Sequence, residues 1–340
     1  MKLRLFFYWL AGTVLAGAVV SVLASCDLSI SPERRPHIQD SPPPTKQQPM
    51  AKRKIQLLHT LEEQESTIEA LAFTPKSNKL ISGNRLGKLK IWNLGAGKQE
   101  RVLESHTKGI KALAISADGK TLVTSDGMTA KVWNLETGKL QQSFQVGMPV
   151  QISADAKVLV SGWLEGRVRI WDVQTGKVVG IIASNSPLAI SADGKFIVSG
   201  DSDNSTTLWN VRDKKSIRFL EKFSGGVYIL SPDGQTLVSS SDEGKVKIWN
   251  LSTGKVERIL KAGIPLAVSP DGLTLATAFG TSIQLWNLVS GELLACLDSS
   301  HSVTKATFSA DGKLLANAVA SALEATNVQQ EAIQVWQVIP

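Results

Sequence analysis

The sequence predicts an all-β fold in which seven tandem copies of a small antiparallel sheet close into a ring. Three observations predict it: a tryptophan-centred string recurs at a nearly constant spacing, turn signals separate apolar runs, and a strand-like segment ahead of the first copy supplies what the last copy lacks. Of the 340 residues, 43% are hydrophobic and 20% are charged. That composition is typical of a globular chain and excludes collagen-like, coiled-coil and wholly disordered proteins.

A string made of an aliphatic residue, tryptophan and a polar residue recurs seven times. Its copies are Ile91-Trp92-Asn93, Val132-Trp133-Asn134, Ile170-Trp171-Asp172, Leu208-Trp209-Asn210, Ile248-Trp249-Asn250, Leu285-Trp286-Asn287 and Val335-Trp336-Gln337. Successive tryptophans stand 41, 38, 38, 40, 37 and 50 residues apart. Repetition at a period of roughly 20 to 50 residues indicates a repeat architecture.

Turn signals divide each copy into hairpins. One set lies between alternating apolar runs: Asp118-Gly119, Asp193-Gly194, Asp233-Gly234, Asp271-Gly272 and Asp311-Gly312. The Asp-Gly pair predicts a tight hairpin, because the turn needs a positive φ that glycine adopts easily. A second set follows the tryptophans: Glu136-Thr137-Gly138, Gln174-Thr175-Gly176, Ser252-Thr253-Gly254 and Val289-Ser290-Gly291. Each copy is therefore predicted to hold two hairpins.

The string, its period and its turns resemble the WD40 repeat, in which four strands form one propeller blade. The resemblance covers Ile55 to Pro340 and implies a single-domain, seven-bladed β-propeller. It also implies that the seven tryptophans of the string pack in the blade cores.

The ring is predicted to close through the N-terminal strand. The chain stops at Val338-Ile339-Pro340, directly after the third strand of the last copy. The segment Ile55 to Leu61 resembles the fourth strand of the other copies. We therefore expect it to pair into the last blade and to cover an edge that would otherwise lack a partner.

WD40 blades commonly share a polar tetrad of histidine, serine or threonine, aspartate and tryptophan. Only the second blade matches all four positions, with His106, Thr124, Asp126 and Trp133. The resemblance implies a hydrogen-bonded network there and departures from it in the other blades.

The N-terminal sequence predicts that the rest of the chain is located outside the cytoplasm. Residues 1–25 read as a signal peptide, with a cationic start and an apolar run. The string Leu23-Ala24-Ser25-Cys26 resembles the lipobox of bacterial lipoproteins, which implies that Cys26 is lipidated. Residues 26–54 then form a proline-rich flexible tether. An uncleaved membrane anchor is the alternative, and either way we expect a membrane-anchored chain that faces the periplasm or exterior.

The sequence does not favour catalysis or nucleic-acid binding. It contains no nucleophile elbow, Walker loop, His-Glu-x-x-His or Cys-x-x-Cys motif, and its four histidines are dispersed. The 37 basic residues exceed the 30 acidic ones without forming a cluster interleaved with aromatics. We therefore expect a non-catalytic protein without cofactor or metal.

Binding of protein partners is the leading functional hypothesis, because WD40-like propellers mostly act as platforms whose loops contact proteins. On the rim that holds the loops between second and third strands, Trp163 and Leu164 stand out. The patch could be extended by Phe279, Met128, Arg85, Leu86 and Phe223. Tryptophan is favoured at binding hot spots, although the ring of Trp163 could instead fold over its own blade. We expect a monomer that binds proteins.

Two alternatives stay open. The central funnel could take a small ligand or a glycan, with hydrolase activity included. The hairpin turns carry eight lysines that could contact anionic lipid or envelope polymer, although neighbouring acids offset much of their charge. The ten or so extra residues of the last copy place 321–328 in an extended loop.

Overall fold

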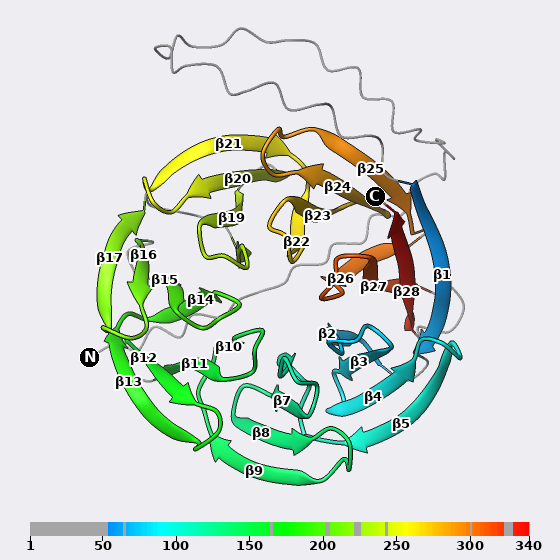
Figure 1. Cartoon of the computed structure of the whole chain (residues 1–340), viewed down its shortest axis with the longest axis horizontal. Helices are drawn as coiled ribbons and strands as arrows, with labels where there is room; N and C mark the ends of the chain where they lie inside the picture. The colour runs from blue at the N-terminus through cyan, green and yellow to red at the C-terminus, as the bar shows by residue number, and fades with distance from the viewer. Residues whose placement is uncertain are drawn as a thin grey trace, which may run out of the picture. The chain divides into compact units, whose positions relative to one another are not determined.

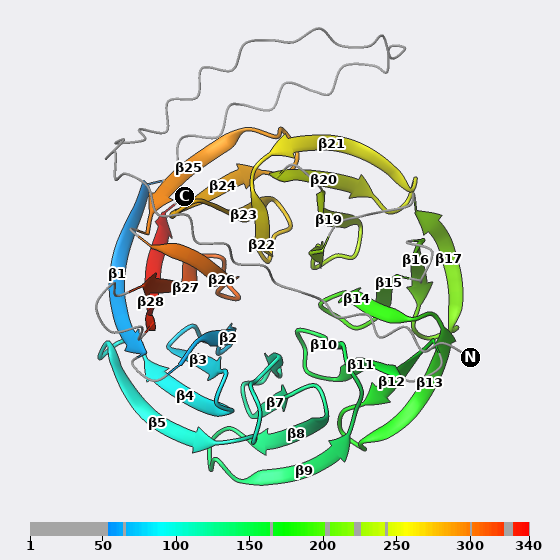
Figure 2. The ribbon, with the colours of Figure 1, turned by 180° about the vertical axis from the view of Figure 1, so that it is seen from behind.

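The computed structural model describes residues 54–63, 66–163, 166–200, 205–220, 226–241, 244–299, 301–322 and 329–339. These residues form 28 strands in seven four-stranded sheets, which stand side by side around a central axis (Figures 1 and 2). The predicted all-β, seven-bladed propeller is confirmed. The predicted signal peptide, Cys26 and the tether up to Arg53 lie outside the described residues. Among the described residues, no helix is long and apolar enough to span a membrane.

Six blades are built from consecutive strands. Blade 1 has β2 (Ile68–Phe73), β3 (Lys79–Asn84), β4 (Lys88–Asn93) and β5 (Lys98–Glu104); blade 2 has β6 (Ala112–Ile115), β7 (Thr121–Ser125), β8 (Thr129–Asn134) and β9 (Leu140–Gln145). Blade 3 has β10 (Val150–Ile152), β11 (Val158–Trp163), β12 (Arg167–Asp172) and β13 (Lys177–Ala183); blade 4 has β14 (Ser186–Ile190), β15 (Phe196–Gly200), β16 (Thr206–Asn210) and β17 (Lys215–Leu220). Blade 5 has β18 (Tyr228–Leu230), β19 (Thr236–Ser241), β20 (Lys245–Asn250) and β21 (Lys255–Lys261); blade 6 has β22 (Ile264–Val268), β23 (Thr274–Phe279), β24 (Ser282–Asn287) and β25 (Leu293–Asp298).

Blade 7 joins the two ends of the ring. It consists of β26 (Ser302–Phe308), β27 (Leu314–Ala322), β28 (Gln329–Ile339) and, as its outer strand, β1 (Lys54–Glu63). β1 and β28 run antiparallel from Lys54 opposite Ile339 to Glu63 opposite Glu331, and they lie side by side in Figures 1 and 2. The predicted closure by the N-terminal strand is confirmed.

The extra length of blade 7 lies mostly in its strands. β27 has nine residues and β28 has eleven, and their pairing continues to Ala322 opposite Gln329. The predicted extended loop of 321–328 is therefore wrong for its first two residues, because Ser321 and Ala322 belong to β27, and residues 323–328 lie outside the described residues.

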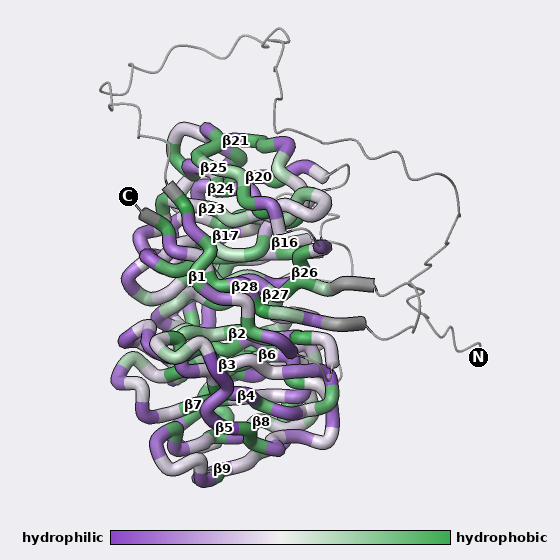
Figure 3. The backbone as a smooth tube through the Cα atoms, turned by 90° about the vertical axis from the view of Figure 1, so that its right-hand side faces the viewer, coloured by the Kyte–Doolittle hydropathy of each residue, from purple (hydrophilic) through white to green (hydrophobic). Residues whose placement is uncertain are grey.

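The hydrophobic cores lie between neighbouring blades. In one of them, Ile81 and Ile91 of blade 1 pack with Leu122 and Trp133 of blade 2. Successive side chains of a strand point to opposite faces, so each sheet contributes to the cores on both of its sides. Figure 3 shows the resulting repeated change between hydrophobic and hydrophilic residues along the strands.

The ring has two rims that differ in their connections. The hairpin rim carries the turns from the first to the second strand of each blade and, in blades 1 to 6, those from the third to the fourth strand. Its turns are fixed locally: the Ser116 hydroxyl donates to Asp118 Oδ1 at 2.5 Å, and that same oxygen accepts from the Lys120 N–H at 2.9 Å. The loop rim carries the connections from second to third strand and from one blade to the next.

The closing strand is predicted to stabilise the ring through one buried side chain. Leu61 of β1 is 2% exposed and shares a core with Trp92 and Val335. We expect Leu61→Ala to lower the free energy of unfolding of the full chain by about 2 to 5 kcal/mol in urea titrations. The control Leu58→Ala removes a side chain that is 39% exposed on the same strand, and its cost should stay below about 1 kcal/mol. Equal effects of the two changes would contradict this account of closure.

Candidate partner-binding rim

Each tryptophan of the repeated string is held by a hydrogen bond within its own blade. Its indole Nε1–H donates to a polar side chain on the second strand. The pairs are Trp92 to Ser82 (2.9 Å), Trp133 to Thr124 (3.0 Å), Trp171 to Ser161 (2.9 Å), Trp209 to Ser199 (2.7 Å), Trp249 to Ser239 (2.8 Å), Trp286 to Thr277 (3.1 Å) and Trp336 to Asn317 Oδ1 (2.6 Å). Five of these rings are buried, whereas Trp209 and Trp286 are half-buried at the edges of their cores.

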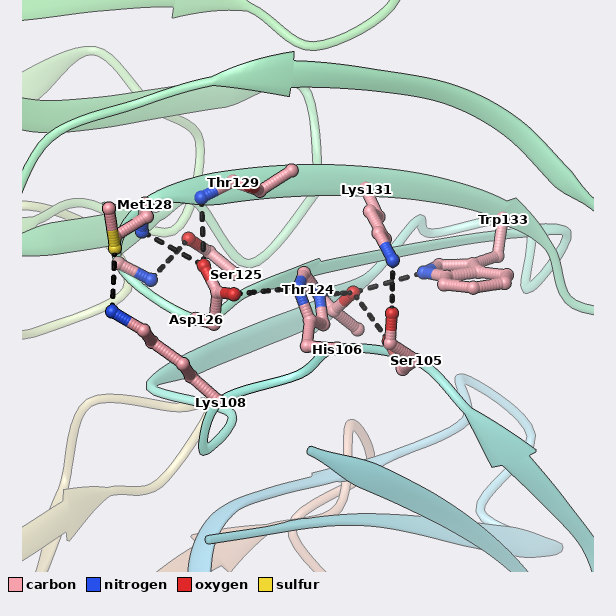
Figure 4. A network of polar contacts seen from close by, with 11 residues as sticks. Ser105, His106, Lys108, Thr124, Ser125, Asp126, Met128, Thr129, Lys131 and Trp133 are labelled. Atoms are coloured by element: carbon pink, nitrogen blue, oxygen red, sulfur yellow. Dashed lines mark hydrogen bonds and ion pairs between the residues drawn. The ribbon is translucent and has the colours of Figure 1, made fainter. Parts of the chain in front are cut away.

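Blade 2 brings all four residues of its expected tetrad together (Figure 4). Thr124 Oγ1 accepts from Trp133 Nε1 and lies 2.9 Å from His106 Nε2. His106 Nδ1 lies 3.4 Å from Asp126 Oδ2, close enough for electrostatic attraction. Because the threonine oxygen already accepts from the indole, its own proton can be donated to Nε2 of a neutral ring. The ring proton then sits on Nδ1 and faces Asp126.

The electrostatics of this network favour a neutral histidine beside an ionised aspartate. Burial lowers the pKa of His106 below its ordinary value of 6.5, and the charge of Lys131 acts in the same direction, while Asp126 opposes both. Burial alone would raise the pKa of Asp126, but hydrogen bonds from the Thr129 and Met128 N–H groups, with the contact to His106, lower it. Asp126 therefore stays ionised and anchors the turn above it.

Other blades replace the histidine with different polar groups. In blade 4 the Ser184 hydroxyl donates to Ser199 Oγ at 2.7 Å. In blade 7 the side-chain amide of Asn317 donates to Gln334 Oε1 at 3.2 Å, and Gln334 in turn donates to the Ser299 carbonyl. The tops of the blades are thus hydrogen-bonded in chemically different ways.

A buried pair of carboxyl groups lies where the ring closes. Glu63 of β1 and Glu331 of β28 face each other in register, and both are buried. Lys90 Nζ lies 2.7 Å from Glu63 Oε1, and the Ile68 N–H donates to Glu331 Oε2. Burial raises the pKa of Glu331. Hydrogen bonds from the Ile68 N–H and the Thr67 side chain act against this, while the charges of Glu63 and Glu69 act with it. These contacts tie β1 and β28 to the first blade.

The central channel contains a cavity of about 760 Å³ at its hairpin-rim end. Its lining is mostly alanine, proline, leucine, isoleucine and phenylalanine, and its polar side chains are those of Asp155, Asp193 and Thr307. Each of the two carboxylates is paired with a lysine of its own turn. A glycan needs hydrogen-bond partners for its hydroxyl groups, so this lining does not favour the glycan or hydrolase alternative.

Few charged side chains lie on or directly before the described inner strands. Lys111 Nζ lies 2.7 Å from Glu69 Oε2, and Lys305 is exposed. Among the described residues, no three histidine, cysteine or acidic side chains are placed to hold a metal ion.

The loop rim displays large apolar side chains. Phe279, predicted as a binding residue, is half exposed at the end of β23, and Arg85, also predicted, is exposed in the loop between β3 and β4. The backbone of Trp163 pairs with Arg167 at the end of β11. The side chain of Trp163, together with Leu164 and Phe223, lies outside the described residues.

Sequence reasoning missed two apolar residues of this rim, Met148 and Ile264. Met148 precedes the inner strand β10, Ile264 is the first residue of the inner strand β22, and both are more than half exposed. In a sequence, a hydrophobic residue at the start of a strand is interpreted as part of the core. Only the shortened connections into blades 3 and 6 could have indicated that these two side chains are exposed.

Four segments of the chain match the family model "WD domain, G-beta repeat": residues 55–93, 97–134, 186–210 and 214–250. The resemblance drawn from the repeats is thereby confirmed. The matched segments lie in blades 1, 2, 4 and 5, together with β1.

Curated relatives share shorter stretches. Apoptotic protease-activating factor 1 of Homo sapiens is 28% identical over 116 residues, which cover 31% of this chain and 9% of that protein. DmX-like protein 1 of Mus musculus is 33% identical over 89 residues, or 26% of this chain and 3% of that protein. Eukaryotic translation initiation factor 3 subunit I of Anopheles gambiae is 29% identical over 92 residues, or 27% of this chain and 28% of that protein. The chain thus matches well under a third of each relative's length.

The blade 2 network predicts that stability falls as the solution becomes acidic. The pKa of His106 is lower in the fold than its ordinary 6.5, so the unfolded chain takes up a proton first when the pH drops. We expect the melting temperature to fall between about pH 7.5 and pH 5.5, and to fall less in His106→Gln, which keeps a hydrogen-bonding amide. The other titrating groups are common to both proteins, so the difference reports on His106. Parallel pH profiles would contradict the assignment.

Proposed function

We propose that this chain, a seven-bladed propeller of WD40 repeats, is a non-catalytic scaffold that is tethered to a membrane outside the cytoplasm and binds proteins with its loop rim. The observation that carries the proposal is the set of large apolar side chains on that rim. Five of them are at least half exposed: Leu86, Met128, Met148, Ile264 and Phe279.

The relatives support a role in protein assemblies. One of them is by name a subunit of a translation initiation factor. A rigid ring that presents variable loops suits the same task, because binding residues are commonly placed on loops that a scaffold positions.

The N-terminal sequence supports the tether. Cys26 ends an apolar run in a lipobox-like string, and the residues that follow it are rich in proline. Two or more acyl chains hold a protein on a membrane far more firmly than one. The chain enters the ring at Lys54, which pairs with Ile339 on the hairpin rim. The loop rim is therefore the face opposite the point where the tether joins.

Site-specific crosslinking in the producing cells tests the scaffold. A photoreactive amino acid at Phe279 or Trp163 should form discrete adducts with other proteins. The control position, Ile259 on the outer strand β21, is 55% exposed but lies away from the loop rim, and it should form few. Equal labelling at the two kinds of position, or none at the rim, would contradict the proposal.

Fractionation of the same cells tests the membrane tether. Cys26→Ala should release the chain from the membrane fraction or leave it unprocessed, whereas Cys296→Ala, which removes the cysteine of β25, should leave fractionation unchanged. Unchanged membrane attachment and mass of Cys26→Ala would rule out lipidation.

A further inference from the structure

We infer that the loop rim over blades 1 to 3 binds an acidic peptide segment that carries apolar side chains. The surface consists of Arg85, Leu86, Lys108, Met128 and Met148 and is called the methionine surface below. The inference rests on the proposed function, since it names the chemistry of the partner that the rim would bind.

The blade 1 side of the methionine surface is packed against the loop that enters blade 2. A Cβ added at Gly87, next to Leu86, would lie 2.7 Å from the Lys108 carbonyl oxygen. One added at Gly109 would lie 3.0 Å from Arg85 Cα. Arg85, Leu86 and Lys108 therefore belong to two loops in direct contact.

The blade 2 side of the methionine surface is joined to these loops by a hydrogen bond. Lys108 Nζ donates to Met128 Sδ at 2.9 Å, which connects the loop that enters blade 2 with the loop between β7 and β8 (Figure 4). A Cβ added at Gly127 would lie 2.6 Å from Met148 Cγ, so Met148 covers the turn that carries Met128. The five residues thus form one continuous surface across three blades.

The centre of this surface is apolar and open. Leu86 is 56% exposed, Met128 50% and Met148 59%. Methionine is flexible and polarisable, and it is over-used at surfaces that bind peptides of varied shape. Leu86, Met128 and Met148 together provide an exposed apolar area that an apolar side chain of a partner can cover.

The edge of the surface is positively charged. Among the described residues, neither Arg85 nor Lys108 has an ion-pair partner. The nearby carboxylates already have partners: Glu69 is paired with Lys111, and Asp126 accepts from two backbone N–H groups and faces His106. Unpaired cations beside an apolar patch favour a partner with acidic residues, because opposite charges steer association and fix its register.

The buried network of blade 2 holds this surface in place. Asp126 Oδ1 accepts from the Met128 N–H at 2.9 Å and from the Thr129 N–H at 2.8 Å, while Oδ2 faces His106 (Figure 4). Gly127 adopts a φ of 86° in this turn, which a side chain would strain. The tip that carries Met128 is therefore preorganised, which lowers the entropic cost of binding.

A second apolar pair on the same rim provides the matched comparison. Ile264 is 55% exposed and Phe279 is 50% exposed, both on blade 6. This pair matches the methionine surface in exposure but lies on the other side of the ring (Figure 1).

Peptide selection tests the inference on the full chain solubilised in mild detergent. Random twelve-residue peptides displayed on phage should enrich for sequences that combine aspartate or glutamate with leucine, phenylalanine or methionine. The affinity of the enriched peptides, made synthetically, should fall by about tenfold or more with Lys108→Glu or Met128→Ala. It should change less than about twofold with Phe279→Ala, and it should weaken as salt is added. Circular dichroism melts of each variant establish that it is folded.

Three results would overturn the inference. They are enrichment of basic or uncharged peptides, loss of binding with Phe279→Ala rather than Met128→Ala, and binding of vesicles rich in anionic lipid with no peptide enriched. The scaffold itself is tested separately by crosslinking in cells. If Phe279 forms adducts in cells but Met128→Ala leaves peptide binding unaltered, the scaffold proposal stands and only the inference about an acidic, apolar peptide is contradicted.

Discussion

The pairing of β1 with β28 is the contact on which the rest of the structure depends. Without β1 the seventh blade would have three strands and an unpaired outer edge, and an exposed edge invites association with other chains. The same strand buries Leu61 in a core that it shares with Trp92 of blade 1. Closure therefore joins the two ends of the described chain by backbone hydrogen bonds and by a common hydrophobic core, and it lets every blade contact two neighbours.

Within that ring, one hydrogen bond is repeated and its surroundings vary. The indole of each blade donates to the second strand in all seven blades, which keeps the blades alike where they pack. Toward the loop rim the partners differ: His106 in blade 2, Ser184 in blade 4 and Gln334 in blade 7. A uniform middle supports a rim that differs from blade to blade, which suits the protein-binding role that we propose.

Most of the fold could be predicted from the sequence because its signals are repeated and local. The number of repeated tryptophan strings gives the number of blades, and Asp-Gly pairs mark turns that need a positive φ. The strand-like segment 55–61 has only one unfilled edge to pair with. The extension of β27 and β28 was missed, because the segment around Ala322 lacks the tryptophan and turn signals that mark the other strands.

The site was less predictable because it depends on which loops meet in space. Arg85 and Phe279 were named from their loops, but Met148 reads as part of an inner strand, and its contact with Gly127 crosses two blades. The ion pair between Lys90 and Glu63 joins residues of different blades, and no local pattern signals it. Contacts between side chains of different blades could therefore not be predicted from the sequence.

Hydrogen–deuterium exchange of the full chain measures the closure most directly. If β1 is the outer strand of blade 7, the amides of β1 that bond to β28 exchange as slowly as those of the outer strands β5 and β21, which belong to blades made of consecutive strands. Rapid exchange throughout residues 54–63, with β5 and β21 still protected, would mean that the ring is not closed by this strand.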